Sequence, residues 1–222
     1  MRSVTALIVG ALVLGGVANA QTNAPAAPGA AAPSKGYVEG VAQSAFGNVT
    51  SQSFGAEMGV RVVAGLQIFV EGGLIRDVSA PATGAAAQLI AGFLSRTQSG
   101  AAAYRVKQPV TFGAAGVKLL FPVHSKLEPY VMVGGGVASV KQDVTFTVGG
   151  TDVTSNMGQY GVVLGSDLSG DFTKPMVTFG GGVVWPMWQQ LVVDFQYRYG
   201  RIFAEDQGIN VGRAGVGVGV RF

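Results

Sequence analysis

The chain has 222 residues, of which 48% are hydrophobic and 12% are charged, with 35 glycines and no cysteine. Charged residues are about half as frequent as in an average soluble domain, and glycine is about twice as frequent. The lack of cysteine excludes disulfides, thiolate metal sites, a cysteine nucleophile and a lipid-modified cysteine. The 15 basic and 12 acidic residues are scattered without a basic run, which argues against a nucleic-acid partner.

The N-terminus has the pattern of a secretory signal peptide. An uncharged, mostly apolar stretch at 4–17 follows a basic start and precedes the cleavage pattern Ala18-Asn19-Ala20. The stretch is shorter than the roughly 20 residues of a membrane-spanning helix, so we expect cleavage after residue 20 rather than an anchor. Residues 21–35 are rich in alanine and proline and are expected to form a flexible linker. One folded domain is expected over 36–222.

The folded part shows the two-residue alternation typical of β-strands. In the last segment Ala, Val and Phe alternate with Gly and Arg, so that one face is apolar and the other is small or cationic. The same alternation appears in three further segments and, less regularly, in four more. The sequence therefore predicts eight strands, at 36–46, 54–62, 66–74, 110–121, 129–144, 176–185, 191–199 and 213–222.

The connections between these strands alternate between short and long. Short segments join the second to the third, the fourth to the fifth and the sixth to the seventh strand, whereas 76–103 and 145–173 are long. Bacterial outer-membrane barrels have short periplasmic turns and longer outer loops, which predicts that both termini are periplasmic. Within the first long loop, Gly84–Ser95 is rich in Ala and Leu and is either a short helix or an irregular surface loop.

Aromatic residues gather near the predicted strand ends, as in the girdles at membrane interfaces. A soluble barrel is the alternative, but it would turn Val216, Val218 and Val220 inward and leave too few charges to solvate its outside. The predicted girdle consists of Phe121, Tyr130, Trp185 and Trp188 at the periplasmic rim and Phe46, Phe54, Tyr199 and Phe203 at the outer rim.

The segment from Gly36 to Phe222 resembles the small outer-membrane β-barrel superfamily of Gram-negative bacteria, the outer-membrane-protein-A-like and opacity-protein-like surface antigens. The resemblance rests on the alternating run 215–222, the strand 193–199 and the strands with three consecutive glycines. It implies an all-β, eight-stranded antiparallel up-and-down transmembrane barrel. It also implies that the last strand is the signal read by the barrel assembly machinery, after transit with periplasmic chaperones, through Val218, Val220 and Phe222.

The polar faces of the strands carry four acids and four bases that we expect to meet inside the barrel. The alternation leaves the facing of Glu39 and Lys118 open. An eight-stranded barrel is just wide enough for side chains to fill, so the set is expected to form an ion-paired plug, with a gate of exchanging partners as the alternative. The predicted cluster consists of Glu39, Glu57, Arg61, Glu71, Lys118, Asp194, Arg198 and Arg213.

These observations predict a non-enzymatic protein with a structural or surface-interaction role, whose recognition surface is formed by 76–103 and 145–173. The alternative is a narrow pore for ions or small solutes. A third hypothesis, a lipid-A-modifying enzyme, depends on His124-Ser125, which lies in a predicted periplasmic turn with no carboxylate spaced to orient the imidazole. We expect no cofactor and no metal, with outer-membrane lipid and lipopolysaccharide as partners and any extracellular ligand left unnamed.

Overall fold

The structure is a computed structural model that describes residues 34–98, 100–121, 123, 125–165, 168–204 and 208–222. The signal peptide predicted over 1–20 lies outside the described residues, as do residues 21–33 of the predicted linker. No helix within the described part of the chain is long and apolar enough to span a membrane.

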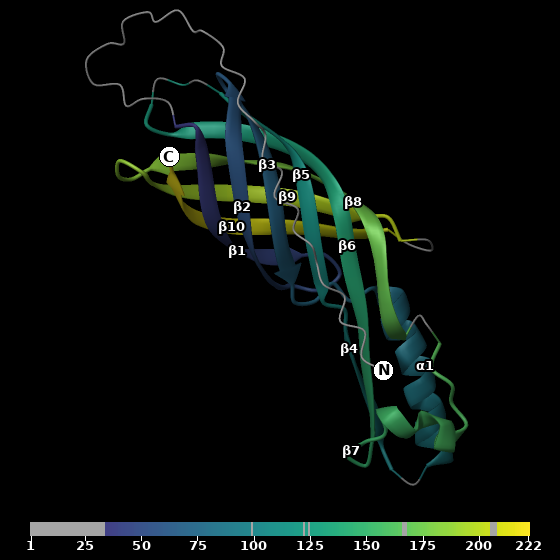
Figure 1. Cartoon of the computed structure of the whole chain (residues 1–222). Helices are drawn as coiled ribbons and strands as arrows, with labels where there is room; N and C mark the ends of the chain where they lie inside the picture. The colour runs from purple at the N-terminus through teal and green to yellow at the C-terminus, as the bar shows by residue number, and fades with distance from the viewer. Residues whose placement is uncertain (1–33, 99, 122, 124, 166–167, 205–207) are drawn as a thin grey trace, which may run out of the picture. The chain divides into compact units, whose positions relative to one another are not determined.

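Eight strands of the described chain form a closed antiparallel ring, which confirms the predicted fold class (Figure 1). Each strand pairs with its neighbour in the ring, and the pairing of β1 with β10 joins the first strand to the last. The strands of the ring are β1 (Gly36–Phe46), β2 (Ser51–Val63), β3 (Leu66–Ile75), β5 (Val110–Leu120), β6 (Glu128–Val148), β8 (Ser169–Pro186), β9 (Leu191–Ile202) and β10 (Ile209–Arg221).

The short connections between strands and the first and last residues of the barrel segment lie at the same end of the barrel, as predicted. The β2–β3 turn consists of Ala64 and Gly65, and Gly65 has a φ of 80°, a left-handed conformation that glycine adopts without steric cost. At the same end, the N–H of Gly36 donates to the carbonyl of Phe222 at 2.9 Å, and the N–H of Phe222 donates back at 3.0 Å. We call this end the terminal end and the opposite one the loop end.

The two predicted long loops are largely folded rather than irregular. Beyond the barrel, β6 and β8 continue side by side to the pair Asp143–Ser169, and β4 (Ala102–Lys107) pairs with the end of β6. Of the two alternatives left open for 84–95, the structure has the helix, and α1 extends beyond that segment to span Pro81–Thr97. A short β7 (Thr151–Asp152) and the 3-10 helix η1 (Thr154–Tyr160) complete this part (Figure 1).

We refer to the segments 76–109 and 141–174 together as the lobe. It has its own apolar core, in which Ala87 and Leu94 of α1 pack with residues of β6 and η1, including Val144, Phe146 and Met157. Alanine and leucine favour the helix, and the pleated faces of β4 and β6 give it an apolar surface to cover. The loop-end extensions of the barrel strands therefore form a second layered unit.

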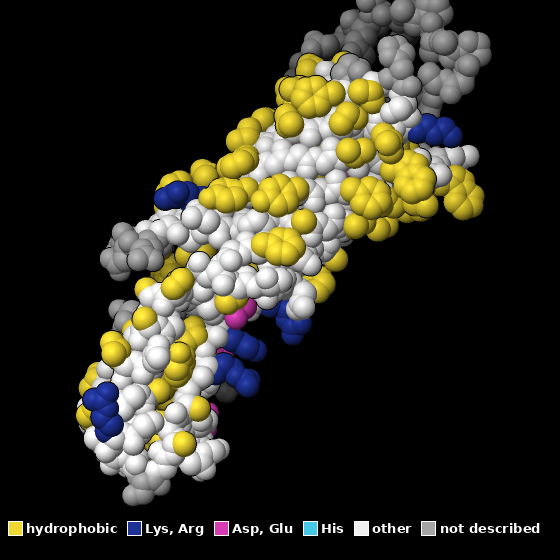
Figure 2. Space-filling model, turned by 180° about the vertical axis from the view of Figure 1, so that it is seen from behind, with side chains coloured by type: hydrophobic (Ala, Val, Ile, Leu, Met, Phe, Trp, Pro, Cys, Tyr) yellow, Lys and Arg dark blue, Asp and Glu magenta, His cyan; other side chains and the backbone are white. Residues whose placement is uncertain are grey.

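The outer wall of the barrel is apolar. Val218 is 53% exposed and Val220 is 48% exposed, whereas Arg213 of the same strand is buried inside. In the face shown in Figure 2, hydrophobic side chains cover the barrel wall, while charged side chains lie toward its ends and on the lobe. The alternation predicted from the sequence therefore separates an apolar exterior from a polar interior.

Candidate functional site

Three glutamates form a row across the inner wall of the barrel. Glu39 of β1 lies directly opposite Glu57 of β2, and Glu57 lies directly opposite Glu71 of β3. Like charges in direct cross-strand contact repel, so this row requires cations from elsewhere in the ring. They come from β5, β9 and β10, which supply Lys118, Arg198 and Arg213.

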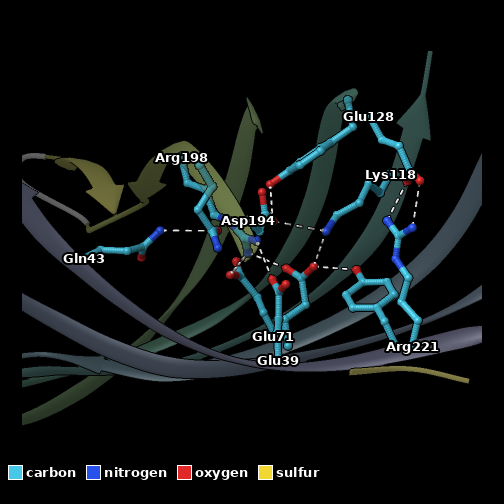
Figure 3. A network of polar contacts seen from close by, with 12 residues as sticks. Glu39, Gln43, Glu71, Lys118, Glu128, Asp194, Arg198 and Arg221 are labelled. Atoms are coloured by element: carbon cyan, nitrogen blue, oxygen red, sulfur yellow. Dashed lines mark hydrogen bonds and ion pairs between the residues drawn. The ribbon is translucent and has the colours of Figure 1, made fainter. Parts of the chain in front are cut away.

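Glu57 is the centre of the network. Its Oε1 accepts from the Nζ of Lys118 at 2.6 Å and from the hydroxyl of Tyr37 at 2.5 Å, and its Oε2 lies 2.5 Å from NH1 of Arg198. The side chain of Glu57 is fully buried. Figure 3 shows Lys118 and Arg198 pointing toward the carboxylates. A buried carboxylate with two cations and a hydroxyl ties four strands of the ring together.

Glu71 has the second set of ion pairs. Arg198 donates to its Oε2, and NH2 of Arg213 lies 3.3 Å from its Oε1. The guanidinium of Arg213 also lies 4.3 Å from the ring centroid of Phe112. This contact places an arginine between the polar network and an aromatic side chain nearer the loop end.

Glu39 is the least paired member of the row. Its Oε1 lies 3.9 Å from NH2 of Arg198 and has no hydrogen-bond partner within the described chain. Oδ1 of Asp194 and Nε2 of Gln196 are buried without partners there as well. Such polar atoms in a lumen are suited to bind ordered water.

Tyr130 is not part of the aromatic girdle, contrary to the prediction. It was predicted to face lipid at the periplasmic rim, but it is 3% exposed and its hydroxyl donates to Oδ2 of Asp194 at 2.8 Å inside the barrel. The Nζ of Lys118 lies between the rings of Tyr37 and Tyr130, 4.5 and 4.4 Å from their centroids. The two tyrosines therefore act as a cation–π pair around the buried lysine rather than as membrane anchors.

The predicted cluster of four acids and four bases is only partly assembled. Glu39 and Lys118, whose facing was left open, both point inward. Arg61 is half-buried and joins none of the ion pairs among the residues that the structure describes, and its Nε is buried without a hydrogen-bond partner among them. Arg61 lies further along β2 than Glu57, toward the terminal end, so its charge is at a different height in the lumen.

Two apolar layers, which the sequence reasoning missed, close the lumen on either side of the network. The layer at the loop end contains Val78 and inward residues from the strand ends, including Ile75, Val110, Val140 and Ile202. Their inward parity along each strand was a signal that could have found them. The layer nearer the terminal end consists of Phe69, Tyr130, Met132, Val184 and Val192, with Leu120 packed against it.

A further ion pair crosses the lumen at the terminal end. NH1 and NH2 of Arg221 lie 2.8 and 2.5 Å from the two carboxylate oxygens of Glu128. Both side chains point inward, and the pair joins β10 to β6 across the intervening β9 and β8. Bidentate arginine–carboxylate contacts are among the stronger hydrogen-bonded pairs in proteins.

The remaining predicted girdle residues lie on the outside of the barrel or its turns. Tyr199 is half-buried, with its ring 4.9 Å from that of Phe179 and its hydroxyl donating to Asn210. Phe222, the last residue of the predicted assembly signal, is 63% exposed. The other outward aromatics are exposed by 41 to 75% and are Phe46, Phe54, Phe121, Trp185, Trp188 and Phe203.

His124 lies outside the described residues, so the predicted weakness of the His124-Ser125 pair is not tested by a contact. Ser125 is exposed at the terminal end, where its hydroxyl donates to the carbonyl of Leu127 at 3.1 Å.

No protein-family model and no curated protein sequence matches the chain. Solved structures match it. Neisserial surface protein A aligns over 85% of this chain and 98% of its own, with a TM-score of 0.53 and 16% identity. The chain has the fold of the small outer-membrane β-barrels.

Two further barrels align at lower TM-scores. Ail, the attachment invasion locus protein of Yersinia pestis, has a TM-score of 0.45 and 13% identity over 84% of this chain and 97% of its own. The N-terminal β-barrel domain of OprF from Pseudomonas aeruginosa has a TM-score of 0.45 and 17% identity, over 86% of this chain and all of that domain (100%).

Proposed function

We propose that the chain is an integral outer-membrane protein in which a sealed barrel serves as the anchor and the lobe serves as the surface-interaction part. The observation that carries the proposal is the filled lumen, where an ion-paired network lies between two apolar layers. If the barrel is sealed, the surface available for binding is that of the lobe. The lobe contains the predicted recognition segments 76–103 and 145–173.

The height of the apolar wall supports a membrane location. The outward side chains of β10 are apolar or small from Phe222 to Gly212. About ten residue steps at roughly 3.3 Å each, tilted by about 40°, span about 25 Å, the height of the apolar band in outer-membrane barrels. Asn210 of β10 then follows at the loop end as an outward polar residue, and its ladder partner is Arg201 of β9.

We further propose that the terminal end is periplasmic and the lobe lies outside the cell, after export by the signal peptide. The short connections at the terminal end support this orientation, because outer-membrane barrels have their short turns in the periplasm. Lipid and lipopolysaccharide are then the immediate neighbours of the wall, and the barrel assembly machinery would read Val218, Val220 and Phe222.

The filled lumen argues against the narrow-pore alternative. Water and ions would have to cross apolar side chains such as Ile202 and Phe69, exposed by 1% and 0%, before and after the charged network. Exchange of ion pairs in the network would leave both apolar layers in place. We propose a non-enzymatic role as well, because the central charged side chains of the lumen, Glu57, Glu71, Lys118, Arg198 and Arg213, are paired with one another.

Conductance of the purified full chain in planar lipid bilayers tests this proposal. We expect no stable conductance above the lipid baseline, with insertion scored independently by the shift in gel mobility between heated and unheated samples. R198A is expected to remain closed, since it leaves the apolar layers intact. A large and stable conductance from the unaltered protein would overturn the sealed-barrel proposal in favour of the pore.

A further inference from the structure

A buried glutamine lies where the lobe joins the barrel. Gln108 is 1% exposed and lies between β4 and β5, where Pro109 interrupts the strand. Its backbone N–H donates to Oδ1 of Asp77 at 3.0 Å, and its carbonyl accepts from the N–H of Val78 at 3.0 Å. The backbone of Gln108 is thus joined to the segment that connects β3 to α1.

The side chain of Gln108 reaches two other elements. Its Oε1 accepts from the N–H of Ala80 at 2.5 Å, and its Nε2 donates to Oγ1 of Thr83 at 3.0 Å and to Oε1 of Gln142 at 2.5 Å. Both amide hydrogens and the amide oxygen are therefore used. One side chain joins the start of α1 to β6, on which the lobe is built.

Gln108 also holds the N-cap residue of α1. The N-cap residue of α1 is Ala80, whose side chain cannot accept a hydrogen bond, so α1 has no side-chain cap, and the N–H of Ala80 donates to Gln108. Asp77 supports the same turn, because its Oδ1 accepts from the N–H of Ser79 at 2.9 Å and its carbonyl accepts from the hydroxyl of Ser51 of β2 at 2.7 Å. The start of the helix is thus held by segments outside the helix, which are joined to the barrel strand β2 through Ser51 and Asp77.

The apolar cores do not provide this connection. Val78 belongs to the loop-end layer of the barrel, and Ala87 belongs to the core of the lobe, and the two are separate clusters. The polar joint consists of Asp77, Ser79, Gln108 and Gln142, which belong to neither cluster. The continuous strands β6 and β8 join the lobe to the barrel, and the directional hydrogen bonds of the joint hold the start of α1 at this junction.

We infer that Gln108 is a positioning residue that holds the start of α1 against β6 and the segment 77–80, where the lobe joins the barrel. The inference deepens the proposed function, because a recognition surface held in one orientation binds without first losing conformational entropy. Its structural content does not depend on that function. Loss of the Gln108 amide leaves the N–H of Ala80 and Oε1 of Gln142 without their partners in a buried site, which loosens α1.

Two near-isosteric variants test the inference by hydrogen exchange of the reconstituted full chain. Q108M keeps the size of the side chain and removes its polar atoms, and is expected to raise exchange in 81–87 by about tenfold with the barrel strands unchanged. Q108E keeps an acceptor for the N–H of Ala80 and the hydroxyl of Thr83 at the positive end of the helix, and is expected to restore most of the protection. Q52M, at an exposed glutamine of the same rim, is the control.

Unchanged exchange in Q108M, or equal loss in Q108M and Q108E, would overturn the inference, since the second result would mean that packing alone holds the helix. If Q108M does not fold, T83V and Q142M each remove one Nε2 contact, and increased exchange in 81–87 supports the inference whereas unchanged exchange refutes it. Conductance or mislocalisation would overturn the proposed function but would leave this comparison intact.

Discussion

Glu57 shows how single residues close the lumen. It accepts from Lys118 and Tyr37 and forms an ion pair with Arg198, whereas Glu39, directly opposite it, has one distant ion pair among the described residues. Charge alone does not separate the two glutamates, since both are buried on the inner wall. The two glutamates differ in the partners of their carboxylates, so the same substitution at each position gives a matched comparison.

We expect E57Q to lower the free energy of unfolding by about 3 to 5 kcal/mol, because it leaves two buried cations without their shared carboxylate. E39Q is expected to change it by less than about 1 kcal/mol, because it removes a charge that repels Glu57 as well as a 3.9 Å contact with Arg198. Urea unfolding of the reconstituted protein, followed by the fluorescence of Trp185 and Trp188, measures both. Equal losses in the two variants would contradict the assigned network.

At the scale of the element, β6 shows that neighbouring glycines have different reasons to be glycine. A Cβ on Gly134, which faces inward, would lie 2.8 Å from the carbonyl oxygen of Ala115 and 3.0 Å from the ring of Phe69. A Cβ on Gly135, which faces outward, would meet nothing closer than 3.8 Å. The inner glycine allows close approach of the strands around an aromatic side chain, and the outer one has no such requirement.

G134A is therefore expected to destabilise the barrel by about 1 to 3 kcal/mol through overpacking. G135A is expected to be neutral or to stabilise it by up to about 1 kcal/mol, since alanine loses less conformational entropy than glycine on folding. The temperature at which the compact gel form converts to the unfolded form compares the two. A larger loss in G135A than in G134A would reverse the faces assigned to β6.

On the scale of the whole molecule, several successive layers of side chains close the lumen along the barrel. From the terminal end, the Glu128–Arg221 pair, an apolar layer, the charged network and a second apolar layer follow one another, and the polar joint and the lobe come after them. The two ends of the barrel differ in structure, with short strand turns at the terminal end and the lobe at the loop end. The side of the membrane on which each end lies can therefore be tested without knowledge of any ligand.

The cysteine-free chain makes that test direct. T151C in β7 of the lobe is expected to react with a membrane-impermeant maleimide on intact cells. Q189C in the short β8–β9 turn is expected to react only after the outer membrane is permeabilised. Both positions are exposed, so accessibility within the protein is matched. Labelling of Q189C but not T151C on intact cells would mean that the proposed orientation is inverted.

Local periodicity determined much of this protein from its sequence. The two-residue alternation is a property of each strand alone, so it predicted the eight strands of the ring and the outward faces of Val218 and Phe222. The alanine-rich composition of 84–95 likewise predicted a helix, although it left an irregular loop as the alternative.

What only the tertiary structure decided is which inward residues share a height and which distant segments pair. The stagger of the closed barrel places Arg61 away from the network and brings Tyr130 to Asp194, and alternation carries no information about that stagger. The pairing of β4 with the end of β6, and with it the burial of Gln108, depends on contacts between residues far apart in the chain. The two-residue alternation determines which face of the sheet each side chain lies on, whereas closure of the ring determines which other side chains it contacts.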